Sequence, residues 1–203
     1  MISTGGVEQL RLNSMNMLMT DIHKKVIDKI AVFDLDGTLY KCNSHVEILN
    51  IYRANWFYKS IFFKLLGLVF PRFILKKNTK DFYELAVFHA ESFHPEFRES
   101  ALNILKEKQK ENYHVIILSN APFELVKEAG RRLNIPAYSA KPGEKSKVID
   151  KLRPFNKLFV CTDNKNDADI LTIADECIVY ASTRNRRYFT KHFPHAVIVK
   201  KIP

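Results

Sequence analysis

The sequence predicts an α/β fold in which a doubly wound, mainly parallel, Rossmann-like sheet carries an inserted all-helical cap domain. Two observations predict it. Short apolar segments alternate along the chain with segments of helical periodicity, which is typical of a parallel sheet covered on both faces. The stretch between Leu39 and Asn112 is helical in pattern and shows no convincing strand, so it interrupts this alternation after the first strand.

Five segments have the pattern of buried strands, because they are short, apolar and rich in β-branched residues. They are Lys29–Phe33, His114–Leu118, Lys157–Cys161, Cys177–Tyr180 and Ala196–Val199. Helices are predicted over Pro122–Leu133, Asn166–Ala174 and Asn185–His192. We therefore divide the chain into a loosely held N-terminal arm (1–28), an α/β core (29–40 and 113–203) and a helical cap (41–112).

Three of the predicted strands end in polar side chains. Asp34 and Asp36 follow the first strand, Ser119 follows the second, and Asp163 follows the third. In open parallel sheets ligands bind beyond the carboxyl ends of the strands. We therefore expect these residues to meet in one site.

The bulk composition is that of one ordinary globular domain with a small insertion. The chain has 203 residues, of which 46% are hydrophobic and 27% charged. Its three cysteines form neither a CxxC pair nor a Cys/His cluster, which argues against a disulfide framework or a zinc site and favours a reducing compartment. The first twenty residues lack the apolar run of a secretory signal, so we expect a cytoplasmic protein.

The net charge of +10 is concentrated in the predicted cap. Between Lys41 and Lys80 there are eight basic residues and one acidic residue, which gives this segment a balance of +7. A nucleic-acid binder would be favoured by the total charge alone. Because most of the excess belongs to one segment, we do not expect nucleic acid as a partner.

The segment after the first strand fits phosphoryl transfer, which needs an in-line nucleophile, a proton for the leaving oxygen and nearby cations. Asp34 and Asp36 lie two residues apart at an extended strand end, so their side chains point the same way and can flank one phosphate. One carboxylate can attack and the other can handle the proton. Gly37 allows a sharp turn, and Thr38 is expected to hold that turn through a hydrogen bond.

The sequence Phe33–Leu39 (FDLDGTL) resembles the first signature of the haloacid dehalogenase-like hydrolase superfamily, and the later strand ends resemble its other signatures in the same order. The resemblance covers roughly residues 29–200 and is closest to the phosphoserine-phosphatase-like branch with a helical cap. It implies a magnesium-dependent phosphatase that hydrolyses a phosphate monoester. Asp34 would be the nucleophile that carries the phosphoryl group, and Asp36 the general acid/base.

The same resemblance implies a Mg²⁺ site formed by Asp34, the Asp36 carbonyl, Asp163 and Asp167. The preference of Mg²⁺ for hard oxygen ligands agrees with this set. Thr162 stands where the superfamily usually has glycine before the first acid of this pair. A small polar residue should be tolerated there.

The resemblance further implies that Ser119 hydrogen-bonds the phosphoryl group and that a lysine neutralises the phosphoryl-aspartate. We also expect Gly37, Thr38 and Asn120 to contact the phosphate. The candidate lysines are Lys141, Lys145 and Lys147. We choose Lys145 because apolar residues follow it at positions +3, +4 and +7, on one helical face that can pack on the sheet, and Lys147 is the second choice.

The cap segment Trp56–Leu75 is predicted to be helical, and it leaves the nature of the substrate open. Fourteen of its twenty side chains are large and apolar, and seven are aromatic. Lys59 and Lys64 argue against a membrane span, which leaves burial in the cap or contact with an anionic membrane. The partner is then a small phosphorylated substrate, or a lipid phosphate met by peripheral contact at the inner membrane surface. A non-catalytic basic module that binds anions or nucleic acid is the remaining alternative.

Overall fold

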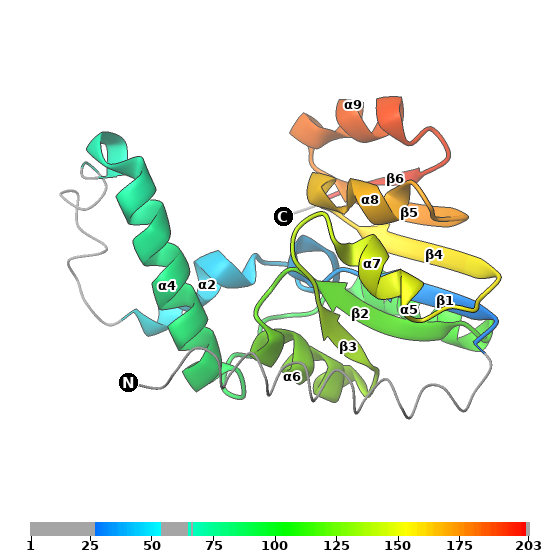
Figure 1. Cartoon of the computed structure of the whole chain (residues 1–203), viewed down its shortest axis with the longest axis horizontal. Helices are drawn as coiled ribbons and strands as arrows, with labels where there is room; N and C mark the ends of the chain where they lie inside the picture. Colours follow the sequence, from blue (N-terminus) through cyan, green and yellow to red (C-terminus); the bar gives the residue numbers. More distant parts are fainter. Residues whose placement is uncertain (1–26, 54–64, 66, 202–203) are drawn as a thin grey trace.

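A parallel sheet of six strands forms the centre of the molecule (Figure 1). The computed structural model describes residues 27–53, 65 and 67–201. The strands are β1 (Lys29–Phe33), β2 (His114–Ser119), β3 (Ala137–Ser139), β4 (Lys157–Thr162), β5 (Glu176–Ala181) and β6 (Val197–Lys200). All neighbouring pairs are parallel, in the order β3-β2-β1-β4-β5-β6. The predicted α/β class is therefore confirmed, and β3 is a strand that the sequence did not predict.

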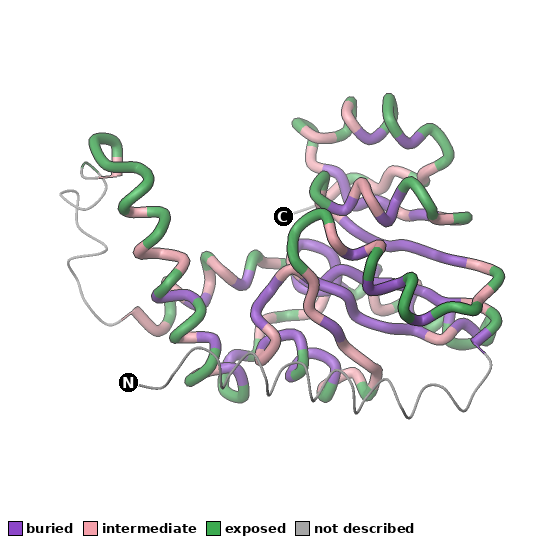
Figure 2. The backbone as a smooth tube through the Cα atoms, viewed as in Figure 1, coloured by how far each residue is buried: buried purple, intermediate pink, exposed green. Residues whose placement is uncertain are grey.

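Helices cover both faces of the sheet. One face packs against α5 (Glu99–Lys110) and α6 (Phe123–Leu133), and the other against α7 (Lys145–Asp150), α8 (Ala168–Leu171) and α9 (Thr183–His192). Alternate residues of a strand serve the two faces: in β1, Ile30 and Val32 lie in one core, and Ala31 and Phe33 in the other. Figure 2 shows the strands as mostly buried and the helices on both sides as partly exposed, as expected for a sheet covered on both faces.

The strand order reverses at β1, and this reversal fixes where a ligand can bind. From β1 the chain builds β2 and β3 on one side and β4 to β6 on the other. Phe33 pairs with Cys161 at the end of the β1–β4 ladder, and the Asp34 amide donates to the Cys161 carbonyl at 2.9 Å. In doubly wound sheets the crevice at such a switch point is the usual ligand site.

Two helices between β1 and β2, α2 (Ser44–Tyr52) and α4 (Pro71–His89), form a small core of their own (Figure 1). Ile48 and Phe82 are buried in it beside Leu125 of α6, so this pair of helices rests on the sheet domain. In contrast, α5 packs on the sheet through Ala101 and Leu105. The predicted boundary at residue 112 thus assigns α5 to the cap, although its buried face packs in the α/β core.

The helix predicted over Trp56–Leu75 does not run through the whole segment. Phe70 has non-helical backbone angles (φ −125°, ψ 61°), and α4 starts at Pro71. Proline suits the first turn of a helix because it has no amide hydrogen to leave unpaired there. Residues 54–64 and 66 lie outside the described residues. Among the helices that the structure describes, none combines the length and the apolarity needed to cross a membrane.

The turn from α6 into β3 depends on a glycine. Asn134 ends α6 in the left-handed region (φ 52°), and the Ile135 amide then donates to the Gly130 carbonyl at 3.0 Å. This turn brings Ala137 so close that a Cβ on Gly130 would lie 2.6 Å from the Ala137 Cβ and 2.8 Å from the Ile135 oxygen. Gly130 therefore permits the close approach of α6 to the edge strand.

We expect Gly130→Ala to lower the free energy of unfolding by about 1–3 kcal/mol, because an added methyl overpacks the contact with β3. Urea denaturation monitored by circular dichroism measures this change. Lys127→Ala is the matched control, since Lys127 is exposed on the same helix and should change stability by less than about 0.5 kcal/mol. Equal stability of Gly130→Ala and the wild-type protein would contradict the proposed contact.

Candidate active site

The carboxyl ends of β1, β2 and β4 meet at a pocket of about 400 Å³. The residues that line it are Asp34, Asp36, Gly37, Asn43, His45, Phe82, Ser119, Asn120, Ala121, Pro142, Asp163, Asn164, Asn166, Asn185 and Lys201. Phe82 comes from α4, Asn43 and His45 come from the start of α2, and the others come from the α/β core. The structure thus brings together most of the residues that the sequence nominated.

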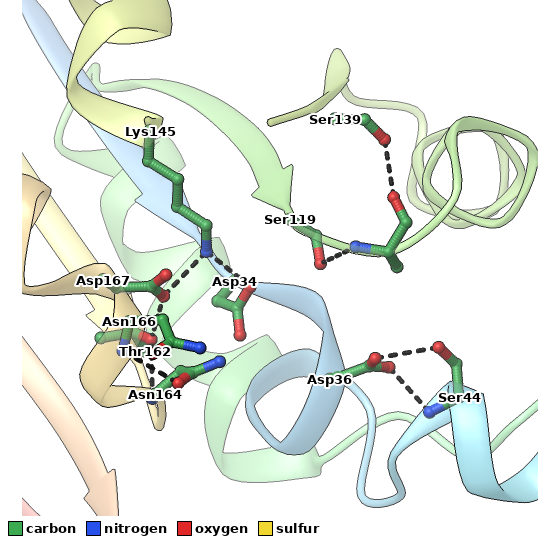
Figure 3. A network of polar contacts seen from close by, with 11 residues as sticks. Asp34, Asp36, Ser44, Ser119, Ser139, Lys145, Thr162, Asn164, Asn166 and Asp167 are labelled. Carbon is green, nitrogen blue, oxygen red and sulfur yellow. Dashed lines mark hydrogen bonds and ion pairs between the residues drawn. The ribbon is translucent and has the colours of Figure 1, made fainter. Parts of the chain in front are cut away.

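A buried lysine joins the pocket residue Asp34 to a second carboxylate, that of Asp167 (Figure 3). The Lys145 Nζ lies 2.7 Å from Asp34 Oδ1 and 2.7 Å from Asp167 Oδ2. All three side chains are at least 94% buried. Burial alone would lower the pKa of Lys145, but the two carboxylates outweigh it and raise that pKa. Lys145 is therefore a permanent cation against Asp34, whereas Lys147 is exposed and pairs with Glu144.

Lys145 is placed by the apolar face that the sequence predicted and by one contact that it did not reveal. It is the first residue of α7, where the Ser146 amide donates to Asp169 Oδ2 at 2.8 Å. The next turn is anchored by Val148 and Ile149 in the core between α7 and the sheet. Asp169 thus fixes the start of the helix that carries the lysine. No local pattern marks it, because its partner is 23 residues away.

Thr162, the departure from the superfamily pattern, belongs to the same network. Its Oγ1 donates to Asp167 Oδ2 at 2.6 Å and accepts from the Asn164 amide at 3.1 Å. Asp167 Oδ2 therefore receives donors from both Thr162 and Lys145, which fixes that carboxylate. Asp167 Oδ1 is buried and has no hydrogen-bond partner among the described residues. A glycine at position 162 could not supply this side-chain hydrogen bond.

Asp36 is held by the first residue of α2. The Ser44 amide and hydroxyl donate to the two oxygens of its carboxylate, both at 2.9 Å. Burial raises the pKa of Asp36 to about 6, and the negative charges of Asp34 and Asp163 act in the same direction, while the Ser44 bonds oppose them. Asp36 thus keeps its proton to higher pH than an ordinary aspartate. Ser44 is a site residue that the sequence analysis missed.

The turn after β1 is made by backbone hydrogen bonds and not by Thr38. The Gly37 amide donates to the Cys42 carbonyl at 2.9 Å, and the Tyr40 amide to the Leu35 carbonyl at 2.8 Å. Gly37 has φ 70°, which explains the need for glycine there. Thr38 is fully buried, its Oγ1 has no hydrogen-bond partner among the described residues, and it does not line the pocket. The expected turn bond and phosphate contact of Thr38 are therefore not seen.

Ser119 and Asn120 lie on the opposite wall, at the end of β2. The Ser119 Oγ accepts from the Ala121 amide at 3.3 Å, which leaves its hydroxyl hydrogen available to the pocket. Asn120 Oδ1 is buried without a hydrogen-bond partner among the described residues. The pocket thus offers a hydroxyl donor and an amide on the β2 side and carboxylates on the β1 and β4 side.

The expected Mg²⁺ ligands are only partly gathered. Asp34 and Asp163 both line the pocket, but in the part of the chain that the structure describes no three acidic, His or Cys side chains form a ready cluster. Asp163 Oδ2 lies 2.6 Å from the Lys201 Nζ, a contact that the sequence did not predict. Burial and the charge of Asp34 raise the pKa of Asp163, and Lys201 opposes them. The donor set of carboxylate oxygens with an unpaired Asp167 Oδ1 suits a hard divalent cation.

No family model and no curated protein matches the sequence, but solved structures resemble its fold. A protein of unknown function from Bordetella pertussis Tohama I has a TM-score of 0.64 at 13% identity, covering 87% of this chain and 100% of that one. A phosphoserine phosphatase solved as a phospho-aspartyl intermediate analogue has a TM-score of 0.57 at 17% identity, over 87% and 94%. A HAD family hydrolase from Salmonella enterica serovar Typhi has 0.57 at 14%, over 85% and 67%. The chain therefore has the fold of the haloacid dehalogenase-like hydrolases.

Proposed function

We propose that the protein is a phosphatase that hydrolyses a phosphate monoester through a phosphoryl-aspartate on Asp34. The observation that carries the proposal is the Asp34 carboxylate itself, which faces the pocket at a strand end and has a buried lysine on one oxygen. Because Lys145 holds Oδ1, Oδ2 is the oxygen left to attack phosphorus. The resemblance of the fold to phosphoserine phosphatase supports this chemistry.

The second carboxylate completes the reaction in this proposal. With a pKa of about 6, Asp36 keeps a protonated fraction near neutral pH and donates that proton to the leaving oxygen. The resulting carboxylate then takes a proton from the water that attacks the phosphoryl-aspartate. The Ser119 hydroxyl binds the phosphoryl oxygens, with Gly37 and Asn120 as further contacts in the pocket. Lys145, which does not line the pocket, neutralises the phosphoryl-aspartate through its contact with Asp34.

Asp34, the Asp36 carbonyl, Asp163 and Asp167 are the groups that would hold Mg²⁺. When bound, the ion offsets charge on the phosphate and on the crowded carboxylates. Lys145 alone cannot do this, because its charge is already shared by Asp34 and Asp167. We accordingly propose Mg²⁺ as the cofactor and a small phosphorylated molecule as the substrate.

A lipid phosphate met at a membrane surface is a second candidate substrate, favoured by the surface around the start of α4. The large apolar side chains exposed there include Leu68 (79%), Val69 (68%), Phe70 (56%) and Phe73 (62%). Arg72 and Lys76 lie among or beside them and are exposed as well. Soluble monomers rarely leave large apolar patches uncovered, and apolar side chains with basic neighbours are typical of contact with anionic membranes. Phe62 and Leu66 of the same predicted helix (Trp56–Leu75) lie outside the described residues.

The central experiment is hydrolysis of an aryl phosphate such as p-nitrophenyl phosphate. We expect turnover with Mg²⁺ and loss of turnover with excess chelator. Asp34→Asn should lower kcat by at least about 1,000-fold, because an amide cannot form the acyl phosphate. Asp28→Asn, an exposed acid at the other end of β1, is the control and should stay active. Full activity of Asp34→Asn, or in chelator, would refute the mechanism, and no turnover at all would favour a non-catalytic anion-binding module.

Asp36→Asn should stabilise the metal-free protein above pH 6. The folded-state pKa of about 6 exceeds the ordinary 3.8, so ionising Asp36 costs stability that is fully lost above pH 6 and regained as the pH falls toward 3.8. Asn cannot ionise and can still pair with the Ser44 amide and hydroxyl. We expect a gain of at most about 3 kcal/mol at pH 8 that fades by pH 4.

Urea denaturation in chelator at several pH values measures this gain. Asp150→Asn is the control, because Asp150 is exposed and should show no comparable gain at pH 8. A stability gain of Asp36→Asn that grew on acidification would contradict the raised pKa of Asp36 in the folded protein.

The membrane candidate predicts that the protein sediments with anionic liposomes at low salt and less so as salt rises, because the Debye length shortens. The double variant Arg72→Glu/Lys76→Glu should reduce binding. Lys106→Glu, an exposed site on α5, makes the same kind of charge change away from α4 and should not. Absence of sedimentation at low salt would leave only the soluble substrate.

A further inference from the structure

Lys201 is a cation of the pocket to which the phosphatase proposal assigns no role. It directly follows β6, and its backbone amide donates to the Ala181 carbonyl at 3.0 Å, so the sheet holds its backbone in place. Its Nζ reaches into the pocket and lies 2.6 Å from Asp163 Oδ2. The two side chains are 26% and 19% exposed. The pair is therefore partly shielded from water and still open to ligands.

The ion pair lies directly against the turn that follows β1. A Cβ added to Gly37 would lie 2.2 Å from the Lys201 Nζ and 2.3 Å from Asp163 Oδ2. Any larger side chain at position 37 would therefore force the Lys201–Asp163 ion pair or the turn to move. Lys201 thus occupies space between the β1 turn and the end of β4, where Asp34 and Asp163 face the same pocket.

The charges of the pocket explain why a cation is held there. Three carboxylates line it, those of Asp34, Asp36 and Asp163. Lys201 is the one Lys or Arg among the described residues that line this pocket. His45 also lines it, but burial lowers the pKa of His45, which favours its neutral form. In the protein without metal, Lys201 therefore offsets part of the negative charge at Asp163.

We propose that Lys201 changes partners when the metal binds: it holds the Asp163 carboxylate in the metal-free protein and binds a phosphate oxygen in the loaded one. The inference rests on the proposed function. A divalent ion held in part by Asp163 would compete with the Lys201 ammonium for that carboxylate, and its higher charge would favour it over the ammonium. Because the hydrogen bond to Ala181 of β5 still holds the Lys201 backbone, the displaced ammonium stays in the pocket and is free to pair with an anion there.

The proposal predicts two effects of opposite sign from one substitution. Lys201→Met removes the competitor, so Mg²⁺ alone, titrated by calorimetry without phosphate, should bind about fivefold more tightly, the size of a partly exposed ion pair. The same variant also lacks a cationic ligand, so inorganic phosphate titrated at saturating Mg²⁺ should bind about tenfold more weakly. A purely structural role for Lys201 would weaken both.

Lys201→Arg keeps the charge and should stay within about twofold of the wild-type protein in both titrations. Lys200→Met is the matched neighbour control, because Lys200 is exposed on the same strand and should change neither affinity. Thermal denaturation shows whether each variant is folded. Unchanged or weaker Mg²⁺ binding by folded Lys201→Met, or unchanged phosphate binding, would overturn the exchange.

The metal titration separates this inference from the phosphatase proposal, because it needs no turnover. A wild-type protein that binds no Mg²⁺ would refute the proposed metal-dependent function itself. A wild-type protein that binds Mg²⁺ and hydrolyses phosphate esters, with Lys201→Met unchanged in both affinities, would refute the exchange alone.

Discussion

The site depends on one buried ion network, the Lys145 ammonium between Asp34 and Asp167. Removing charges from water costs several kcal/mol for each ion, and only close, well-directed partners offset that cost. The structure meets this condition with two contacts of 2.7 Å and with the Thr162 hydroxyl on Asp167. Loss of one partner would leave an uncompensated buried charge. Asp34, the proposed nucleophile, is thus fixed by the same interaction that constrains the ends of β1 and β4 and the start of α7.

The larger elements of the fold could be predicted because their cause is local. β1, β2 and β4 are apolar segments that can be recognised directly in the sequence. Because the strands are parallel, the polar residues at their carboxyl ends meet at one edge of the sheet. β3 has only three residues, Ala137–Ser139, and owes its place to Gly130 and to pairing with β2. An element that short carries too few residues to show a period of its own.

The parts of the site that escaped prediction are those made by distant pairs. Ser44, Asp169 and Lys201 meet their partners across 8, 23 and 38 positions, through helix starts and a strand end that no motif links to the DxD turn. Thr38 shows the reverse case. A residue inside the motif, for which a turn bond was expected, is buried with an unpaired hydroxyl, because the backbone closes the turn without it.

The two hydrogen bonds from Ser44 to Asp36 link proton affinity to helix position. Both donors belong to the first residue of α2, and both favour the ionised carboxylate. Loss of these two bonds on its own would strengthen the hold of Asp36 on its proton. By thermodynamic linkage, protonation of Asp36 weakens these two contacts with Ser44 by the same free energy. The proton affinity of Asp36, the proposed acid, and the strength of its contact with the start of α2 therefore belong to one equilibrium.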